Sequence, residues 1–421
     1  MNSLETAKAL DQNDSLSQFK NRFFHPDNEL YFDGNSLGKM PLSAQNQLIS
    51  SIQKEWGKGL IRSWNTHWLE LPDRLSSKYS QLLNTYKNEI SIGESTSVRL
   101  YEVIHALLES REFGPNLISD SLNFPTDLYI LDGLARSFKK TQRIQVDYKN
   151  EIEADLNQLK LTIKENPGIV CLSLVSYKSA FLYPMNMLNQ WAKDHQSIIV
   201  WDLSHAVGAV SIDLKATQTR VALGCTYKYM NGGPGAPAFL FIQKALHSKL
   251  NNPIQGWFGH QKPFDFNTEY KPANDINRFA AGTPAVLSMQ AMEAGIDLTL
   301  EAGIKAIHSK SIQLSESFIR LFETHLIPLG FELESPTNPT HRGSHVTLSH
   351  PASWQVCQTL LAGSPTHPKM IPDFRPPNYI RFGFTPLYTS FEDIWHLVQR
   401  LKTLTTSKDY LNFDQTKPIV T

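Results

Sequence analysis

The chain has few cysteines, no net charge and no long apolar segment. Three cysteines in 421 residues argue against a disulfide framework and are typical of a reducing cytoplasm. Lysine and arginine together number 40, as do aspartate and glutamate, so no excess charge indicates a nucleic acid or an acidic partner. The first residues are polar, and no run of about 18 apolar residues occurs. We therefore expect a cytoplasmic protein that binds neither a membrane nor nucleic acid.

The pattern of the chain predicts an α/β protein with more than one core. From about residue 68 to 300, short apolar strands alternate with helical segments, which is the mark of parallel βαβ units. The continuous apolar run at residues 169–175 predicts a central strand buried on both faces. Residues 238–242 are expected to return antiparallel. Helical spacing also predicts a helix over residues 42–58 and a long helical segment, about Val286 to Phe322, that leaves the large domain.

A glycine-rich segment at residues 224–235 surrounds Lys228. This lysine lies between two tyrosines, and Gly-Gly-Pro-Gly follows at residues 232–235. Such glycines allow a tight turn and a close backbone approach to a bulky ligand. An amine at a strand end in a dry cleft loses its proton and forms a Schiff base with a carbonyl cofactor. The alternative is an ordinary solvated lysine on the surface.

A second signal precedes the lysine. The apolar run at residues 198–201 ends at Asp202, and His205 follows. A buried carboxylate at the C-terminal end of a strand suits the ring nitrogen of pyridoxal phosphate (PLP), because it keeps that nitrogen protonated and the ring able to accept electrons. With Asp202 and Lys228 in this order, we predict a lysine-anchored PLP site.

Strand-to-helix loops carry groups that suit the rest of this cofactor. Ser95 and Thr96 open a helical segment, where hydroxyls and backbone N–H groups bind a phosphate. Phe124 lies beside a proline before another helix, and an aromatic ring there stacks on a flat ligand. Ser173 can reach the same site from its strand. The alternatives are an ordinary helix cap at Ser95 and a core position for Phe124.

Arg381 stands in an apolar, strand-like stretch at residues 379–388. A buried guanidinium without an anion is costly, and its planar fork binds a carboxylate through two hydrogen bonds. We predict that Arg381 clamps the carboxylate of an amino-acid substrate. The alternative is an interior ion pair that serves only the fold.

Taken together, these motifs resemble the kynureninase family of fold-type I PLP enzymes, and most of all its bacterial members. The matching stretches lie in unbroken order over nearly the whole chain. They are residues 31–38, 55–64, 123–129, 201–205, the Lys228 segment, and residues 256–260, 342–345 and 381–388. Several of these stretches are long, which makes chance a poor explanation.

The resemblance implies the fold-type I PLP-dependent transferase architecture. It predicts a large domain with a mainly parallel seven-stranded sheet and a smaller α+β domain. We expect residues 1–60 to contribute to the small domain and the active-site rim. Residues 61–300 are expected to form the PLP-binding domain, and residues 301–421 the small domain. A homodimer with shared active sites is also implied.

The implied activity is hydrolysis of L-kynurenine to anthranilate and L-alanine, in tryptophan breakdown and NAD biosynthesis. A second candidate substrate is 3-hydroxykynurenine. Cleavage between Cβ and Cγ requires removal of the α-proton and addition of water to the γ-carbonyl. By resemblance, Lys228 binds PLP and moves the α-proton, Asp202 pairs with the ring nitrogen, and Tyr227 relays protons. No metal site is predicted.

The remaining site residues follow from the resemblance alone. It places Phe124, Asp127, Ser173 and His205 around the PLP ring. It assigns the phosphate to Ser95, Thr96 and Tyr227, together with Trp257 and Thr283 of the neighbouring subunit. It assigns the substrate α-carboxylate to Arg381, and it makes Ser36, Trp64 and His260 the candidates for the aryl ketone end.

The chain departs from the expected pattern at three places. Ala180 and Phe181 stand where a glycine and a tyrosine are expected, and Ala206 and Val207 replace a more usual pair after the histidine. The loop at residues 362–372 also differs in length or composition. None of these departures removes a residue assigned to chemistry, although bulk near the cofactor bears on substrate preference.

Two other functions are weighed against this one. A cysteine desulfurase on the same fold uses a mobile cysteine in a C-terminal loop, but Cys357, the one late cysteine, stands in a helical-looking segment. A non-catalytic relative used for binding or regulation is expected to have lost Lys228, Asp202 or Arg381, and all three are present.

Overall fold

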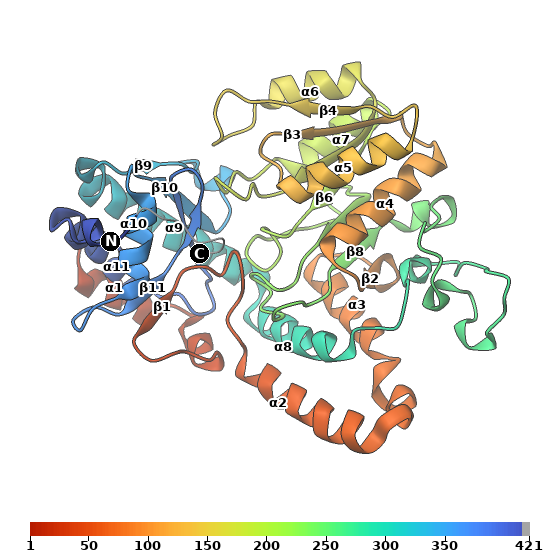
Figure 1. Ribbon diagram of the computed structural model, residues 1–421, viewed down its shortest axis with the longest axis horizontal. Coiled ribbons are helices and arrows are strands. Elements are labelled where there is room, and N and C mark those ends of the chain that lie inside the picture. The colour runs from red at the N-terminus through yellow and green to blue at the C-terminus, as the bar shows by residue number, and fades with distance from the viewer. Residues whose placement is uncertain (415–421) are drawn as a thin grey trace.

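The computed structural model describes residues 1–414 and contains a large and a small half, each built on its own sheet (Figure 1). The strands of the large sheet are β2 (Ile90–Ile92), β3 (Asn116–Asp120), β4 (Arg143–Val146), β5 (Gly168–Ser173), β6 (Ile198–Asp202), β7 (Val221–Gly224) and β8 (Phe239–Ile242). Their order in the sheet is β2-β8-β7-β6-β5-β3-β4. Only β8 runs antiparallel to its neighbours β7 and β2. The predicted seven-stranded, mainly parallel sheet is confirmed, as is the antiparallel return.

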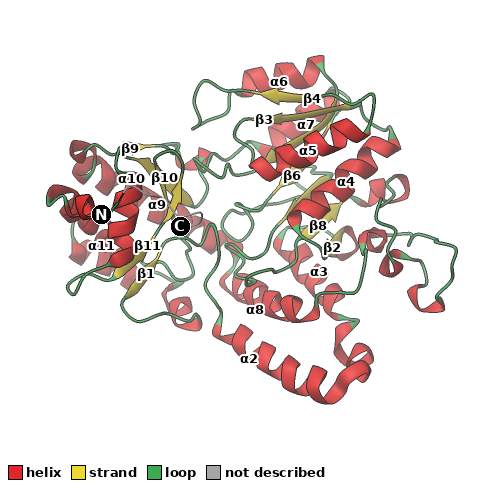
Figure 2. Ribbon diagram, viewed as in Figure 1, coloured by secondary structure: helices red, strands yellow, loops and turns green. Residues whose placement is uncertain are grey.

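Helices cover both faces of the large sheet, because its strands carry apolar side chains on both faces. They are α3 (Leu71–Leu82), α4 (Thr96–Ser110), α5 (Pro125–Ser137), α6 (Leu156–Glu165), α7 (Met185–Asp194) and α8 (Val286–Ala302). In β5, Val170 and Leu172 join a core with α3, α6, α7 and α8, whereas Ile169 and Cys171 join a core with α4 and α5. Successive strand residues point to opposite faces, so a strand covered on both sides reads as continuously apolar. Figure 2 shows the resulting helix–sheet–helix layers.

The small half contains an antiparallel sheet in the order β12-β13-β10-β9. Its strands are β9 (Glu332–Leu333), β10 (His345–Ser349), β12 (Asp373–Arg375) and β13 (Tyr379–Gly383). The helices that share its core are α1 (Leu4–Gln12), α9 (Ile304–His325), α10 (Ser353–Ala362) and α11 (Phe391–Thr406). The N-terminal segment adds Ala7 and Phe32 to this core. The division of the chain at residues 60 and 300 stays a prediction.

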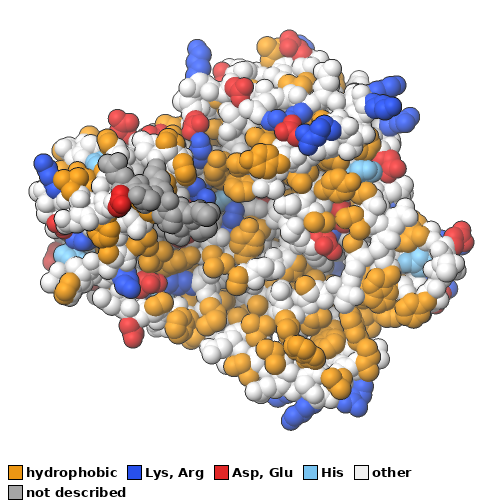
Figure 3. All heavy atoms as spheres, in the orientation of Figure 1, with side chains coloured by type: hydrophobic (Ala, Val, Ile, Leu, Met, Phe, Trp, Pro, Cys, Tyr) orange, Lys and Arg blue, Asp and Glu red, His pale blue; other side chains and the backbone are white. Residues whose placement is uncertain are grey.

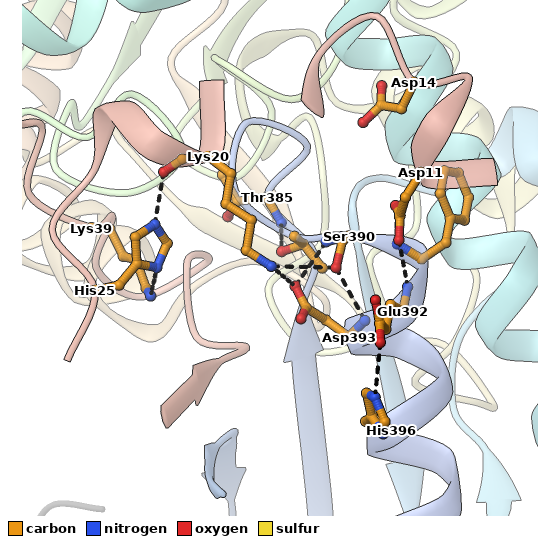
Figure 4. A network of polar contacts seen from close by, with 12 residues as sticks. Asp11, Asp14, Lys20, His25, Lys39, Thr385, Ser390, Glu392, Asp393 and His396 are labelled. Carbon is orange, nitrogen blue, oxygen red and sulfur yellow. Dashed lines mark hydrogen bonds and ion pairs between the residues drawn. The ribbon is translucent and has the colours of Figure 1, made fainter. Parts of the chain in front are cut away.

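The N-terminal segment is held to the small half by two sets of contacts. The strands β1 (Glu29–Tyr31) and β11 (Lys369–Ile371) pair in parallel. Asp11 accepts hydrogen bonds from the backbone N–H groups of Phe391 and Glu392, at 2.8 and 2.9 Å, and Lys20 pairs with Asp393 at 2.8 Å (Figure 4). A carboxylate at a helix N-terminus satisfies N–H groups that have no partner inside the helix. These contacts anchor the chain just before residues 33–38, where Ser36 contacts Arg381 and the Gly38 N–H donates to the carbonyl of Tyr227.

Two predicted helices differ from the structure. The expected helix over residues 42–58 begins as α2 (Leu42–Ser50) and continues as a wider, π-type helix (Ser51–Gly59). The long helix expected from Val286 is divided into α8 and α9, because Gly303 adopts a φ of 79° that an α-helix does not allow. Within residues 1–414, no helix is both long and apolar enough to cross a membrane.

Candidate functional site

The predicted cofactor residues meet at one edge of the large sheet. Ser173 ends β5, Asp202 ends β6, and the two residues are register partners. The next strand, β7, ends at Gly224 and leads into the segment that carries Lys228. Because these strands are parallel neighbours, their C-terminal ends open at the same edge, which is where ligands bind in such sheets. The structure therefore brings Ser173, Asp202 and Lys228 together.

The amine of Lys228 is held by His205. Lys228 Nζ lies 2.8 Å from His205 Nε2. Burial, and then the charge of Lys228, hold the pKa of His205 well below its usual value. The imidazole is therefore neutral, and it accepts this hydrogen bond at Nε2 while carrying its own proton on Nδ1. His205 Nδ1 is buried and has no partner in the described part of the chain.

Two buried carboxyl groups lie beside this lysine. Asp202 accepts hydrogen bonds from the backbone N–H of Ser204, at 2.9 Å, and from its hydroxyl, at 2.5 Å. Burial raises the pKa of Asp202, whereas Ser204 and Lys228 oppose the rise. Burial and the charge of Asp202 hold the pKa of Asp127 well above its usual value. Asp127 Oδ2 has no hydrogen-bond partner within residues 1–414. A ligand with a protonated ring nitrogen, such as PLP, fits these carboxyl groups because its charge favours their ionised forms.

The loop after β3 lines the same region. Ser173 Oγ donates a hydrogen bond to Asn123 Oδ1 at 2.6 Å, and the Asn123 amide donates to the backbone carbonyl of Cys171 at 3.2 Å. These bonds hold the loop so that Phe124, the next residue, lies 5.9 Å from Lys228 Nζ. The ring of Phe124 meets Tyr177 edge-on at 5.2 Å. Phe124 is thus next to the lysine, as predicted, and its role in stacking stays a prediction.

A cavity of about 680 Å³ opens between the start of α4 and the segment that precedes α8. The predicted site residues that line it are Ser95, Thr96, Tyr227, His260 and Thr283. Ser95 caps α4 by accepting a hydrogen bond from the Val98 N–H at 3.4 Å, and the positive end of the helix favours an anion there. Thr283, which was assigned to a neighbouring subunit, lines this cavity in the same chain as Ser95.

Two predicted tryptophans belong to an aromatic group beside this cavity. Trp64 lies 6.1 Å from Phe258, measured between ring centroids, and Phe258 lines the cavity. Trp257 packs on Phe258 at 4.3 Å and is 39% exposed. An exposed tryptophan is available to a ligand or a second subunit, whereas Trp64 packs against Phe258, which lines the cavity.

Arg381, on β13, is buried and fully engaged. Its guanidinium donates hydrogen bonds to Asp373 and to the backbone carbonyl of Tyr177, and Nη2 also donates to Ser36 Oγ at 3.2 Å. Asp373 is its register partner on β12. Arg381 therefore forms an interior ion pair, the alternative considered from the sequence, and its role toward a substrate carboxylate stays a prediction.

His345 is a residue of this region to which sequence reasoning gave no role. Its ring lies 5.6 Å from that of His205, between centroids, and burial holds its pKa well below the usual value. The carbonyl groups of Lys178 and Tyr177 oppose that shift. Neither ring nitrogen makes a hydrogen bond with any residue that the structure describes. The sequence feature that could have identified His345 was its place in residues 342–345, a stretch that resembles the family.

Two of the residues that depart from the family pattern, Ala180 and Phe181, lie where the two halves of the molecule meet. Ala180, where glycine was expected, adopts a φ of 65°, in the left-handed region that glycine favours. Its carbonyl accepts a hydrogen bond from the Gly343 N–H at 2.8 Å and joins the two halves. Phe181 is buried and packs on Tyr183. In the described chain, no group of three His, Cys, Asp or Glu side chains is placed to hold a metal ion.

The chain matches two family models and several relatives. The "Kynureninase C-terminal domain" model matches residues 307–401, and the "Aminotransferase class-V" model matches residues 77–350. Kynureninase from Burkholderia pseudomallei is 35% identical over 407 residues, which cover 96% of this chain and 95% of that protein. Kynureninase from Pseudomonas fluorescens is 36% identical over 398 residues and 93% of each chain.

Solved structures of similar fold include PLP enzymes that act on sulfur compounds. The apo cysteine desulfurase from Thermococcus onnurineus has a TM-score of 0.77 at 18% identity, covering 90% of this chain and 95% of that one. A variant of C-DES with glycine covalently linked to its PLP cofactor has a TM-score of 0.79 at 17% identity, covering 91% and 98%. This likeness confirms the predicted fold-type I architecture and shows the fold alone.

Cys357 is not placed like the mobile loop cysteine that a cysteine desulfurase requires. This residue lies in α10 and is 2% exposed, so it is part of the core and not of a mobile loop. The identity to relatives over nearly the full length, and the match to a C-terminal domain model specific to them, are decisive. The chain belongs to the kynureninase family.

Proposed function

We propose that this protein is a PLP-dependent hydrolase that cleaves the Cβ–Cγ bond of L-kynurenine and releases anthranilate and L-alanine. The observation that carries the proposal is the meeting of Lys228, Asp202 and Arg381 around one site in a chain of the kynureninase family. Lys228 and Arg381 both lie close enough to His205 to lower its pKa, and the charge of Lys228 opposes the rise that burial causes in the pKa of Asp202. The hydroxylated substrate, 3-hydroxykynurenine, is a second candidate.

We assign PLP to the space between the strand ends and the cavity. When bound, PLP supplies an electron sink for the charge left at Cα once the α-proton is removed. Lys228 holds its aldehyde end, and Asp202 holds its ring nitrogen. Asp127, Ser173, His205 and Phe124 surround the ring, and Ser95, Thr96 and Tyr227 hold the phosphate. Two observations support this assignment. Asp127 Oδ2 is buried and has no hydrogen-bond partner among the described residues, and Ser95 and Thr96, at the start of α4, line the cavity.

We assign the movement of the α-proton to Lys228. Neutral His205 accepts a hydrogen bond from the amine and so orients it without adding a positive charge beside it. Burial, followed by the nearby Cys225, raises the pKa of Tyr227 above its ordinary value. Its phenol therefore keeps its proton at neutral pH and is suited to donate a hydrogen bond to an oxygen that gains charge. Tyr227 is our candidate for the proton relay when water adds to the γ-carbonyl.

Substrate recognition is assigned to two ends of the site. Arg381 binds the α-carboxylate, and Ser36, which touches the guanidinium, assists it. The aryl ketone faces the aromatic group beside the cavity, where Trp64 and His260 are the candidates. Aromatic side chains bind a flat aryl ring through offset stacking or edge contacts.

We also propose a homodimer in the cytoplasm, with active sites shared between the two copies. Figure 3 shows hydrophobic side chains gathered over α2 and the segment that follows it. The exposed apolar residues there include Ile49, Ile52, Trp56, Leu60 and Ile61. A large exposed apolar patch marks an interaction surface in a soluble protein. Trp257 and Thr283 are the residues proposed to serve the phosphate of the other copy. Analytical ultracentrifugation of the holoenzyme measures its mass in solution, and we expect the mass of two chains.

The test of the function uses two variants and a control. We expect Lys228→Ala to abolish release of anthranilate, measured by its fluorescence, and to lack the visible absorbance of lysine-bound PLP. The matched control is Lys164→Ala, at an exposed position of α6, which should retain both signals. Arg381→Ala should raise KM strongly, because a charge-assisted pair with the substrate is lost. Undiminished turnover in Lys228→Ala would refute the assignment.

A further inference from the structure

Asp33 lies beside Arg381 because the N-terminal segment takes the place of a strand. Strand β12 pairs with β13, and its first residue, Asp373, is opposite Arg381. Beyond this start of β12, Asp33 forms a bridge with Gly383 of β13. Alternate residues of a strand point to the same face, so Arg381 and Gly383 share a face of the small sheet. Their neighbours, Asp373 and Asp33, place two carboxyl groups on the side of the guanidinium.

The two carboxyl groups are bonded very differently. Asp373 accepts hydrogen bonds from the guanidinium of Arg381 and, at 2.9 Å, from Arg375 Nε. Asp33 Oδ1 is buried and has no hydrogen-bond partner among residues 1–414. Ser36 and Arg381 favour the ionised form of Asp33, and burial and Asp373 oppose it. Asp373 is thus the fixed anion of the group, and Asp33 is the carboxyl group that is free to change its charge.

Among the residues that the structure describes, three charged groups act most strongly on the pKa of Asp33. These are Asp373 and Arg375 from β12 and Arg381 from β13. The titratable groups that also face Asp33 are Tyr31 from β1, Tyr229 from the lysine segment, Tyr388 after β13 and Cys357 from α10. Burial raises the pKa of all four, so they stay neutral near pH 7. Across β13, His345 is also neutral, because burial lowers its pKa.

A count of these charges shows what a bound carboxylate changes. The positive charges of Arg375 and Arg381 are neutralised when Asp33 and Asp373 are both ionised. A substrate carboxylate at Arg381 adds a third negative charge, and the group is then balanced only when Asp33 carries a proton. Burial, and secondly the charge of Asp373, already raise the pKa of Asp33 to about 7. A further anion nearby raises it more, since like charges disfavour the ionised form.

We propose that Asp33 takes up a proton when a substrate carboxylate binds at Arg381, so that Asp33 makes substrate binding depend on pH. The inference rests on the proposed role of Arg381 and adds a second residue to the carboxylate site. The protonation state of Asp33 sets the net charge of the group around Arg381 to which the substrate carboxylate binds. Asp33 forms no bond with the reacting atoms. Protonated Asp33 permits binding, and ionised Asp33 opposes it.

The expected size of the effect follows from linkage. If binding requires the protonated form, the dissociation constant grows as pH rises through the pKa of the free protein. With a pKa of about 7, the dissociation constant rises about tenfold between pH 6 and pH 8. At pH 8, binding takes up close to one proton per site, and at pH 6 it takes up close to none.

The test uses the desamino analogue of kynurenine, which keeps the carboxylate and the aryl ketone and lacks the amine that reacts with PLP. Its binding to the holoenzyme is measured by titration calorimetry at pH 6, 7 and 8. Two buffers with different enthalpies of ionisation give the number of protons taken up. The variants are Asp33→Asn, which resembles the protonated carboxyl group, and Asp11→Asn as the matched control. Asp11 is also an aspartate of the small half whose pKa is raised by burial, and it contacts α11 instead of Arg381.

We expect a tenfold pH dependence in the wild type and in Asp11→Asn, and nearly constant, tight binding in Asp33→Asn. Absence of proton uptake in the wild type at pH 8 overturns the inference without any variant. An unchanged pH dependence in Asp33→Asn overturns it as well. Failure of the proposed function has a different signature, because Arg381→Ala would then bind the analogue as tightly as the wild type.

Discussion

Asp373 forms a buried ion pair with Arg381. The substitution Asp373→Asn tests how much the stability of the fold depends on this ion pair. The two side chains are 3% and 1% exposed. The amide has nearly the same shape as the carboxylate, so the substitution removes the charge without creating a cavity. Removing one partner of a buried ion pair costs about 3–5 kcal/mol. Each kcal/mol lowers the melting temperature by about 2–4 °C for a domain of 150–250 residues. We therefore expect a fall of about 6–20 °C.

Differential scanning calorimetry of the holoenzyme measures this change. The matched control is Arg375→Gln, which removes the other cation bound to Asp373. The side chain of Arg375 is 38% exposed, and such solvated pairs contribute about 0–1 kcal/mol. Its melting temperature should fall by less than about 4 °C. A melting temperature of Asp373→Asn within about 2 °C of the wild type would refute the view that Arg381 depends on this carboxylate.

Three further predictions concern other parts of the molecule. Gly38→Ala places a methyl group 2.3 Å from the backbone oxygen of Lys228, so the lysine segment must shift; we expect weaker PLP binding, measured by equilibrium dialysis. Asp202→Asn removes the carboxylate that we assign to the ring nitrogen of PLP and should lower kcat strongly, measured as anthranilate release, while the protein stays folded by circular dichroism. Burial raises the pKa of Asp120 to about 6 in the folded protein. The unfolded chain ionises first, so this group makes stability fall as pH rises from about 4 to about 6. Asp120→Asn should remove that part of the slope of melting temperature against pH, and an unchanged slope would contradict the argument.

The sequence predicted those parts of the site that follow from strand order. Asp202 and Lys228 stand at the ends of consecutive apolar runs, and parallel strands place such ends at one edge of a sheet. The fold class was predictable for the same reason, because continuous apolar runs separated by helical segments specify a parallel sheet covered on both faces. The break between α8 and α9 at Gly303 was missed, since glycine inside a helical pattern is often tolerated.

The contacts of Arg381 depended on the tertiary structure. Ser36 and Tyr177 lie 345 and 204 residues from Arg381 in the sequence, and only Asp373, on the adjacent strand, is nearby, at eight residues. The same holds for His345, which reaches the ring of His205 from the other half of the molecule. Cross-strand register and the packing of the two halves place these groups, and neither is encoded by residue spacing along one segment.

The sequence by itself determined the prediction of a lysine-anchored PLP site, because Asp202 and Lys228 stand in a fixed order after neighbouring apolar runs. The tertiary structure alone decided the electrostatics of the carboxylate site. Asp33 is far in sequence from Asp373 and Arg381, and the burial of the three side chains against one another sets which of them carries a charge. The pKa of a carboxyl group depends on the solvent and the charges that surround it in space.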